Sequence, residues 1–197
     1  MSKLILTDVD GVLLDWATGF DNWMMAQGFQ HVPGNEHAYL IDQRFIDVEY
    51  DQSKKLIRAF NESTDVGELM PLRDSIDGMR MLSSKGYTFG VISSHSDVDH
   101  ACKQREDNLL RNFGDVFEFF IHLPTGADKD DALDKFRGTN YWWIEDKAEN
   151  ALAGRDRGLR SLLMHHEFNA DDVLDGVTRV KNWREIYDIM MSVDNLN

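Results

Sequence analysis

Residues 4–15 read LILTDVDGVLLD, and this stretch decides how the rest of the chain is interpreted. An apolar run from Leu4 to Thr7 precedes two acids, Asp8 and Asp10, and Gly11 follows them. A short apolar run bounded by turn residues is typical of a strand buried on both faces, as in parallel sheets. Gly11 allows a sharp turn behind the acids. The stretch therefore predicts a buried strand that presents two carboxylates at its carboxyl end.

The rest of the chain alternates between short apolar runs and helical patterns. Further strands are expected at residues 88–92, 117–123, 141–144 and 161–164. Helices are expected between and after them, at residues 74–85, 97–112, 130–136, 148–157 and 183–191. Strands that alternate with helices indicate a parallel sheet covered on both faces. The fold class we expect is α/β, a Rossmann-like three-layer sandwich with a central parallel sheet.

One stretch breaks this alternation. Between Asp15 and Pro71 there is no convincing buried strand, and residues 16–27 and 52–61 have helical patterns. Open α/β sheets bind ligands at the carboxyl ends of their strands. A helical insertion that leaves from the end of the first strand would therefore lie over that edge. We expect a core domain of residues 1–15 and 71–197 and a small helical cap of residues 16–70.

Composition narrows the classes of function. The 197 residues include 21 basic and 35 acidic side chains, a formal net charge of −14. This balance argues against binding a nucleic-acid polymer or an anionic membrane surface. The single cysteine, Cys102, excludes an intrachain disulfide and a cysteine zinc cluster, and no apolar run reaches the length of a membrane span. We expect a cytoplasmic protein of open oligomeric state.

The paired acids carry the strongest chemical signal. One carboxylate can attack an electrophile, the second can transfer a proton, and a divalent cation between them would let an anion approach a phosphate. An acidic surface turn and a calcium-binding loop share the Asp-x-Asp-Gly pattern. A calcium loop continues with oxygen donors, whereas Val12-Leu13-Leu14 supplies no side-chain ligand.

Three weaker signals follow later strands. Ser93 and Ser94 come after the second strand, where a hydroxyl can bind phosphate or simply cap the next helix. Lys129 is a lone cation among four acids. Such a lysine either belongs to a binding site or lies at a helix start that is exposed to solvent. Glu145 and Asp146 follow an aromatic strand, and adjacent acids there favour a bound cation unless one caps the helix in solvent.

Together, the four signals resemble the motifs of the haloacid dehalogenase-like superfamily, in its phosphatase branch with a small helical cap. The resemblance covers nearly the whole chain, because the motifs match in order and spacing and the insertion matches in position. It implies a Mg²⁺-dependent phosphatase that hydrolyses a small phosphomonoester through an aspartyl-phosphate. The dehalogenating members lack the second carboxylate, so the presence of Asp10 favours phosphoryl transfer.

The resemblance also implies roles residue by residue. Asp8 would be the nucleophile, and Asp10 the acid/base, with a raised pKa and a backbone carbonyl that binds the metal. Ser93 would bind the transferring phosphoryl group, and Lys129 would neutralise Asp8 and the phosphoryl charge. Gly11 joins these residues in phosphate binding.

The resemblance also implies which acids bind the metal. Asp146, with Glu145, would complete the magnesium site of Asp8 and Asp10. The list of competitors is short: Ser94 for the role of Ser93, and Lys135 or Lys147 for that of Lys129. Asn150 would act behind the metal ligands and orient them.

Other functions stay open at this point. A nucleotidase similar to 5'(3')-deoxyribonucleotidases would share the Asp-x-Asp-Gly-Val-Leu opening, and a phosphomutase would share the core. A phosphoacceptor signalling module combines similar residues, although its phosphorylated aspartate ends a central strand. The cluster of His95, Asp97, Asp99 and His100 could be a second metal site, but a polar helix start is the more common occurrence.

Overall fold

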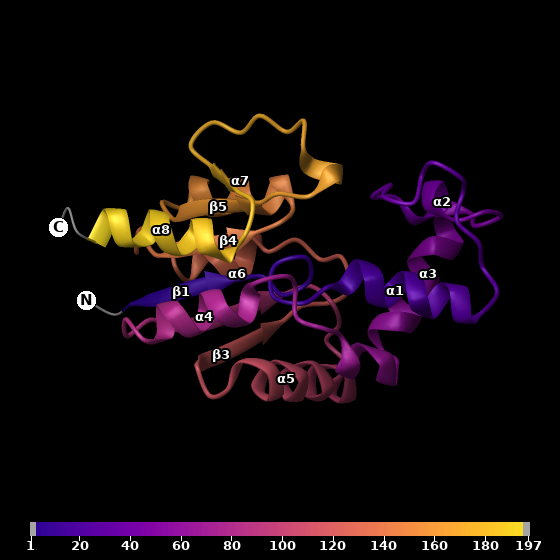
Figure 1. Ribbon diagram of the computed structural model, residues 1–197, viewed down its shortest axis with the longest axis horizontal. Coiled ribbons are helices and arrows are strands. Elements are labelled where there is room, and N and C mark those ends of the chain that lie inside the picture. The colour runs from indigo at the N-terminus through magenta and orange to yellow at the C-terminus, as the bar shows by residue number, and fades with distance from the viewer. Residues whose placement is uncertain (1–2, 195–197) are drawn as a thin grey trace.

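The central layer is a six-stranded parallel sheet in the order β3-β2-β1-β4-β5-β6 (Figure 1). It is seen in a computed structural model that describes residues 3–194. The strands are β1 (Leu4–Thr7), β2 (Thr88–Ser93), β3 (Phe117–His122), β4 (Trp142–Glu145), β5 (Arg160–Met164) and β6 (Thr178–Val180). The expected fold class is confirmed, and each of the five expected strands lies within one residue of its predicted ends.

β1 lies in the middle of the sheet, between β2 and β4. Its residues alternate between the two faces, because Ile5 packs in one core cluster and Leu6 in the other. Leu6 lies opposite Gly90 of β2 and Trp143 of β4. Burial on both faces explains why this strand is an apolar run without polar alternation.

Helices cover both faces of the sheet. On one face lie α4 (Ser75–Ser83), α5 (Asp99–Phe113) and α8 (Trp183–Asp194), which contribute Met79, Leu109 and Trp183 to a shared core. The short α6 (Asp130–Asp134) and α7 (Ala148–Asp156) pack together on the other face. These five helices lie within three residues of their predicted ends. No helix of the described residues is both long and apolar enough to cross a lipid bilayer.

Helices α1 (Trp16–Ala26), α2 (Ile41–Arg44) and α3 (Tyr50–Asn61) of residues 16–70 lie beyond the edge of the sheet (Figure 1), whereas the 3₁₀ turn η1 (Thr64–Glu68) at the end of this range packs against α5. Phe20 is fully buried here, 4.7 Å between ring centroids from Trp16 and 5.4 Å from Phe60. Contacts between aromatic rings therefore hold α1 and α3 together, and Phe20 and Phe60 belong to the same hydrophobic cluster as Ile5 of β1.

Hydrogen bonds join the two connections between this segment and the sheet. The Asp15 N–H donates to the Met70 carbonyl at 2.9 Å, and the Leu72 N–H donates to the Leu13 carbonyl at 2.8 Å. Residues 1–2 and 195–197, which belong to the expected core range, lie outside the described residues.

Candidate active site

A cavity of 1390 Å³ lies between the carboxyl edge of the sheet and residues 16–70. All residues that the sequence assigned to the site line it: Asp8, Asp10, Gly11, Ser93, Ser94, Lys129, Glu145 and Asp146. They come together because β1, β2 and β4 are neighbours and parallel, so their carboxyl ends meet at one edge.

Lys129 lies between two carboxylates. Its Nζ is 2.6 Å from Oδ1 of Asp8 and 3.0 Å from Oε1 of Glu145. Lys129 is 2% exposed and Glu145 is fully buried. Burial alone would lower the pKa of Lys129, but Asp8 and Glu145 outweigh this effect and raise the pKa above its usual value. The lysine is therefore held as a cation.

Three carboxylates gather around this one cation. Ligand oxygens of Asp8, Glu145 and Asp146 lie within 4.8 Å of one another. Burial, followed by repulsion from Glu145, raises the pKa of Asp8 to about 8. Burial, Glu145 and Asp8 also raise the pKa of Asp146 well above its usual value. The cluster therefore has a surplus of negative charge, which suits a hard divalent cation with oxygen ligands such as Mg²⁺.

Glu145 differs from the other two acids because protein donors already satisfy it. Its Oε1 accepts hydrogen bonds from Lys129 and Asn150, and its Oε2 accepts one from the Asp146 N–H at 2.7 Å. Although burial would raise its pKa, Lys129 and Asn150 lower the pKa of Glu145 overall. The side chains best suited to hold a cation are thus those of Asp8 and Asp146, with Glu145 fixing Lys129.

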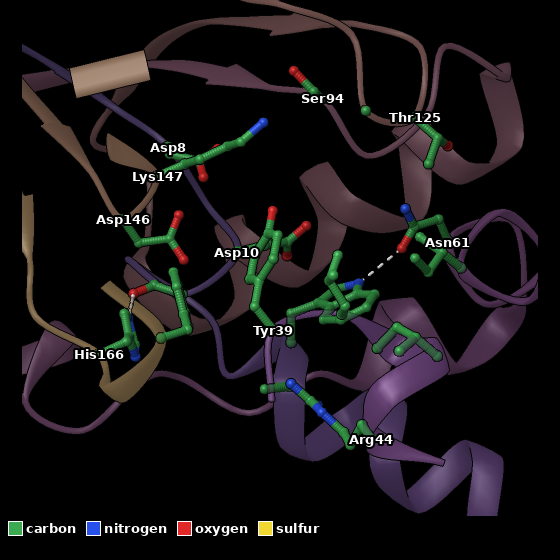
Figure 2. Close-up of a pocket in the computed structure, with 18 of the residues that line it drawn as sticks. Asp8, Asp10, Tyr39, Arg44, Asn61, Ser94, Thr125, Asp146, Lys147 and His166 are labelled. Carbon is green, nitrogen blue, oxygen red and sulfur yellow. Dashed lines mark hydrogen bonds between the residues drawn. The ribbon is translucent and has the colours of Figure 1, made fainter. Parts of the chain in front are cut away.

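Gly11 is required by two features of the turn after β1. Its φ of +73° lies in the left-handed region, and a Cβ there would lie 2.1 Å from Oδ2 of Asp146. Nε2 of His166 lies 2.7 Å from the Gly11 carbonyl oxygen, a contact that Figure 2 shows. Absence of a side chain at Gly11 therefore lets the Asp146 carboxylate approach the turn that carries Asp10.

Asp10 lies outside the carboxylate cluster, in contact with a residue that the sequence analysis missed. Both oxygens of its carboxylate accept hydrogen bonds from Arg105 of α5, with Nη2 at 3.2 Å from Oδ2. Arg105 is fully buried, whereas the Asp10 side chain is 25% exposed. An arginine is common in any amphipathic helix, so no sequence signal marks this one.

Ser93 and Ser94 line the cavity at the end of β2. The Oγ atoms of both are buried and have no hydrogen-bond partner among the described residues. Buried hydroxyls usually have a partner, so a ligand oxygen is a natural one here. Both hydroxyls therefore fit the phosphate-binding role that the sequence assigned first to Ser93 and second to Ser94.

The competing lysines lie elsewhere. Lys135 is exposed and does not line the cavity. Lys147 lines it but lies 4.0 Å from Glu149, with its side chain 40% exposed. Of the three side chains, only that of Lys129 forms an ion pair with Asp8 or Glu145 within the described residues, although the Lys147 N–H donates to Oε2 of Glu145 at 3.5 Å.

The histidines after β2 do not assemble a second metal site. Within residues 3–194, the cluster of Asp8, Glu145 and Asp146 is the one group of three ligands close enough to share an ion. Burial, followed by the charge of Arg105, lowers the pKa of His95 to about 2, so this imidazole is neutral. The expectation that these residues form a polar helix start fits this arrangement better.

The segment of residues 16–70 adds one side chain that the sequence analysis did not single out. Tyr39 projects into the cavity toward the acids (Figure 2), and its ring lies 4.9 Å between centroids from Phe168 of the core. Burial, followed by the charge of Asp146, raises the pKa of Tyr39 to about 12. Because Tyr39 lies in an irregular loop, no periodicity pointed to it.

Solved structures share the fold of nearly the whole chain. A haloacid dehalogenase-like hydrolase, SP0104 from Streptococcus pneumoniae, matches with a TM-score of 0.66 and 17% identity, covering 96% of this chain and 98% of its own. The chain has the haloacid dehalogenase-like fold.

Two further structures show how widely this haloacid dehalogenase-like fold is used. CbbY from Rhodobacter sphaeroides, solved in complex with phosphate, matches with a TM-score of 0.60 and 15% identity, covering 94% of this chain and 96% of its own. L-2-haloacid dehalogenase from Xanthobacter autotrophicus matches with a TM-score of 0.60 and 11% identity, covering 97% and 99%. The fold alone therefore does not choose between phosphoryl transfer and dehalogenation.

Comparisons of sequence add little to this result. No family model matches the chain. An uncharacterized 32.4 kDa protein of Enterobacteria phage T4, from the Gp30-rIII intergenic region, is 26% identical over 141 residues, which is 68% of this chain. The alignment spans half of the length of that relative.

Proposed function

We propose that this chain is a Mg²⁺-dependent phosphatase that hydrolyses a small phosphomonoester through an aspartyl-phosphate on Asp8. The observation that carries the proposal is the surplus of carboxylates, because Asp8, Glu145 and Asp146 lie within 4.8 Å of one another and Lys129 pairs with Asp8 and Glu145 only. A divalent cation would balance the surplus, and Asp10, which dehalogenating members lack, lies two residues from Asp8. Partnerless hydroxyls of Ser93 or Ser94 lie in the same cavity.

The proposed reaction has two steps. In the first, a carboxylate oxygen of Asp8 attacks phosphorus, the bond from phosphorus to the leaving oxygen breaks, and Asp10, which enters this step in its protonated form, gives that oxygen its proton. In the second, water attacks phosphorus and gives a proton to Asp10, and the carboxylate of Asp8 leaves. This cycle returns both aspartates to their starting states.

The other residues stabilise charge during these steps. Lys129, 2.6 Å from Asp8, would balance the developing phosphoryl charge in a buried site where such contacts are strong. A serine hydroxyl at the end of β2 would bind phosphoryl oxygens, whereas the Gly11 N–H already donates to the Leu14 carbonyl at 2.9 Å. Bound Mg²⁺, held by Asp8, Asp146 and the Asp10 carbonyl, would supply the neutralisation that lets the anionic nucleophile approach an anionic phosphate.

Residues 16–70 would act as a cap over the core of residues 1–15 and 71–197. They supply one wall of the cavity, including Tyr39 and Arg44, while the reacting groups belong to the core. This division would place selectivity in the cap and chemistry at the sheet edge. The substrate of this capped site would be a small phosphorylated compound in the cytoplasm.

A nucleotidase is the second candidate, and an aromatic pair favours it. The rings of Tyr39 and Phe168 lie on opposite sides of the junction between cap and core and are 51% and 36% exposed. Exposed rings at a cavity can stack on a nucleobase. For a nucleotidase, Tyr39→Ala should raise KM for nucleoside monophosphates at least fivefold and leave KM for sugar phosphates unchanged. An equal change for both classes would remove this candidate.

The main proposal is tested by measuring phosphate release from a panel of phosphomonoesters with and without Mg²⁺. Repeated turnover that requires Mg²⁺ is expected, whereas a signalling module would take up phosphate and release it slowly. Asp8→Asn should abolish turnover and leave the fold intact. Asp128→Asn, which changes an exposed acid near the site, is the matched control and should retain activity. Substantial turnover by Asp8→Asn would overturn the proposal.

A further inference from the structure

Arg105 lies immediately behind the proposed acid/base. Its guanidinium faces both oxygens of the Asp10 carboxylate, with Nη2 at 3.2 Å from Oδ2. Asp10 lines the cavity, but Arg105 does not and is fully excluded from solvent. A substrate in the cavity can therefore contact Asp10, while Arg105 can influence it only through Asp10.

The ion pair between Arg105 and Asp10 constrains both the position and the orientation of the Asp10 carboxylate. A guanidinium binds a carboxylate through two parallel N–H groups, which fixes the rotation of the carboxylate plane, whereas an ammonium provides one point of attraction. Asp10 is the sole ion-pair partner of Arg105 within residues 3–194. A buried charge without a partner is costly, so separating Asp10 from Arg105 would destabilise the protein. This cost holds the Asp10 carboxylate in place.

Helix α5 gives Arg105 a fixed base. Asn108, on the same helix, donates to the carbonyls of Gly67 at 2.8 Å and Leu69 at 3.0 Å, in the segment that returns from the cap to the core. Arg111 also donates to the Gly67 carbonyl. The same helix therefore holds the cap connection and the Asp10 carboxylate, although Asp10 itself lies on a turn.

We propose that Arg105 is a positioning residue that orients the Asp10 carboxylate toward the leaving-group oxygen. The inference rests on the proposed function and adds a residue that acts one layer behind it. Its consequence is specific: loss of the bidentate contact should slow the step that needs a proton from Asp10 and spare a step that does not.

The test compares two leaving groups in single-turnover experiments. An alkyl phosphate needs protonation of its leaving oxygen, whereas p-nitrophenyl phosphate releases a stable anion. Arg105→Lys keeps the charge and removes the fork, and it should slow phosphoryl transfer from the alkyl ester 10- to 100-fold, since general acids contribute about 10²–10⁴. The p-nitrophenol burst should change less than threefold.

Controls separate positioning from general damage. Arg111→Lys changes a guanidinium on the same helix that does not contact Asp10, so it should affect both substrates by the same factor. If Arg105→Lys also slows both substrates equally, Arg105 is only structural and the proposal is overturned. If the wild type acts on neither substrate, the proposed function fails instead.

A measurement on the wild-type protein avoids variants that fail to fold. The ¹⁵N side-chain resonances of Arg105 should show hindered rotation of the guanidinium, as a bidentate contact requires, both without ligand and with Mg²⁺ and fluoroberyllate. Free rotation in the presence of the phosphoryl mimic would overturn the proposal, because Asp10 would then be released from Arg105 at the moment of reaction.

Discussion

Asp8 and Asp10 are two residues apart on one turn, yet their surroundings have opposite charge balance. Asp8 shares Lys129 with Glu145 and lies beside Asp146, and burial and repulsion raise its pKa to about 8. Asp10 has an arginine to itself. A surplus of carboxylates therefore suits a site that binds a cation. An ion pair of one carboxylate with one guanidinium suits a carboxylate that must keep a fixed orientation.

The difference arises from where the backbone directs each side chain. Asp8 follows β1 directly and stays in the sheet, since its N–H donates to the Ile144 carbonyl of β4 at 2.9 Å. It therefore lies beside the acids that end β4. Asp10 lies past the strand, and its side chain reaches α5 on the other side of the turn. A separation of two residues is therefore enough to give Asp8 and Asp10 different ion-pair partners.

The largest effect should come from removing the charge of Asp10. Asp10→Asn leaves the buried guanidinium of Arg105 without a counter-charge, and we expect a loss of about 3 kcal/mol in the free energy of unfolding, the lower end for breaking a buried pair. Urea denaturation at pH 7 without metal measures it. Asp8→Asn should cost much less in the same assay, because Lys129 keeps Glu145 as an ion-pair partner. Equal losses for the two variants would contradict the comparison.

The pH dependence of stability without metal should sharpen the comparison further. The pKa of Asp8 rises from 3.8 to about 8 on folding, so between these values the folded state binds more protons and stability falls as pH rises. His95, with its pKa lowered from 6.5 to about 2, has the opposite effect, but only below pH 6.5. The window from pH 6.5 to 8 therefore isolates the carboxylates.

Within this window we expect a loss of about 2 kcal/mol, at up to ~1.4 kcal/mol per pH unit. Saturating Mg²⁺ should reduce the slope, because the cation favours ionised carboxylates. Asp8→Asn should reduce it as well, and Asp128→Asn should leave it as in the wild type. Thermal or urea denaturation at several pH values gives the slope. A stability that rises from pH 6.5 to 8 in the metal-free protein would contradict the assigned charge surplus.

The smallest effect should come from a residue behind the cluster. Asn150 donates to Oε1 of Glu145 and is 9% exposed. Asn150→Ala should cost about 1 kcal/mol in stability, the usual value of one hydrogen bond, and weaken Mg²⁺ binding less than about tenfold, because it acts on Glu145 and not on Asp8 or Asp146. Calorimetric titration with Mg²⁺ measures the affinity. Unchanged affinity would show that Glu145 keeps its orientation through Lys129 alone.

Several strands and turns of this structure could be predicted from local sequence patterns. The apolar run of β1, the turn at Gly11 and the acids after β4 are signals within a few residues, so their elements were predicted to within one residue. β6 was missed because Thr178–Val180 is short and half-exposed, and it becomes a strand only by pairing with β5. α2 was missed for a similar reason, since four residues carry no period.

The sequence by itself determined the α/β class, the first five strands and the acids, serines and lysine at the strand ends, because these depend on periodicity and on short motifs. The tertiary structure alone decided the charge balance at each of them. Lys129 is 16 residues from Glu145, and Arg105 is 95 residues from Asp10. Burial and distance set the strength of such contacts, and neither is a property of local sequence.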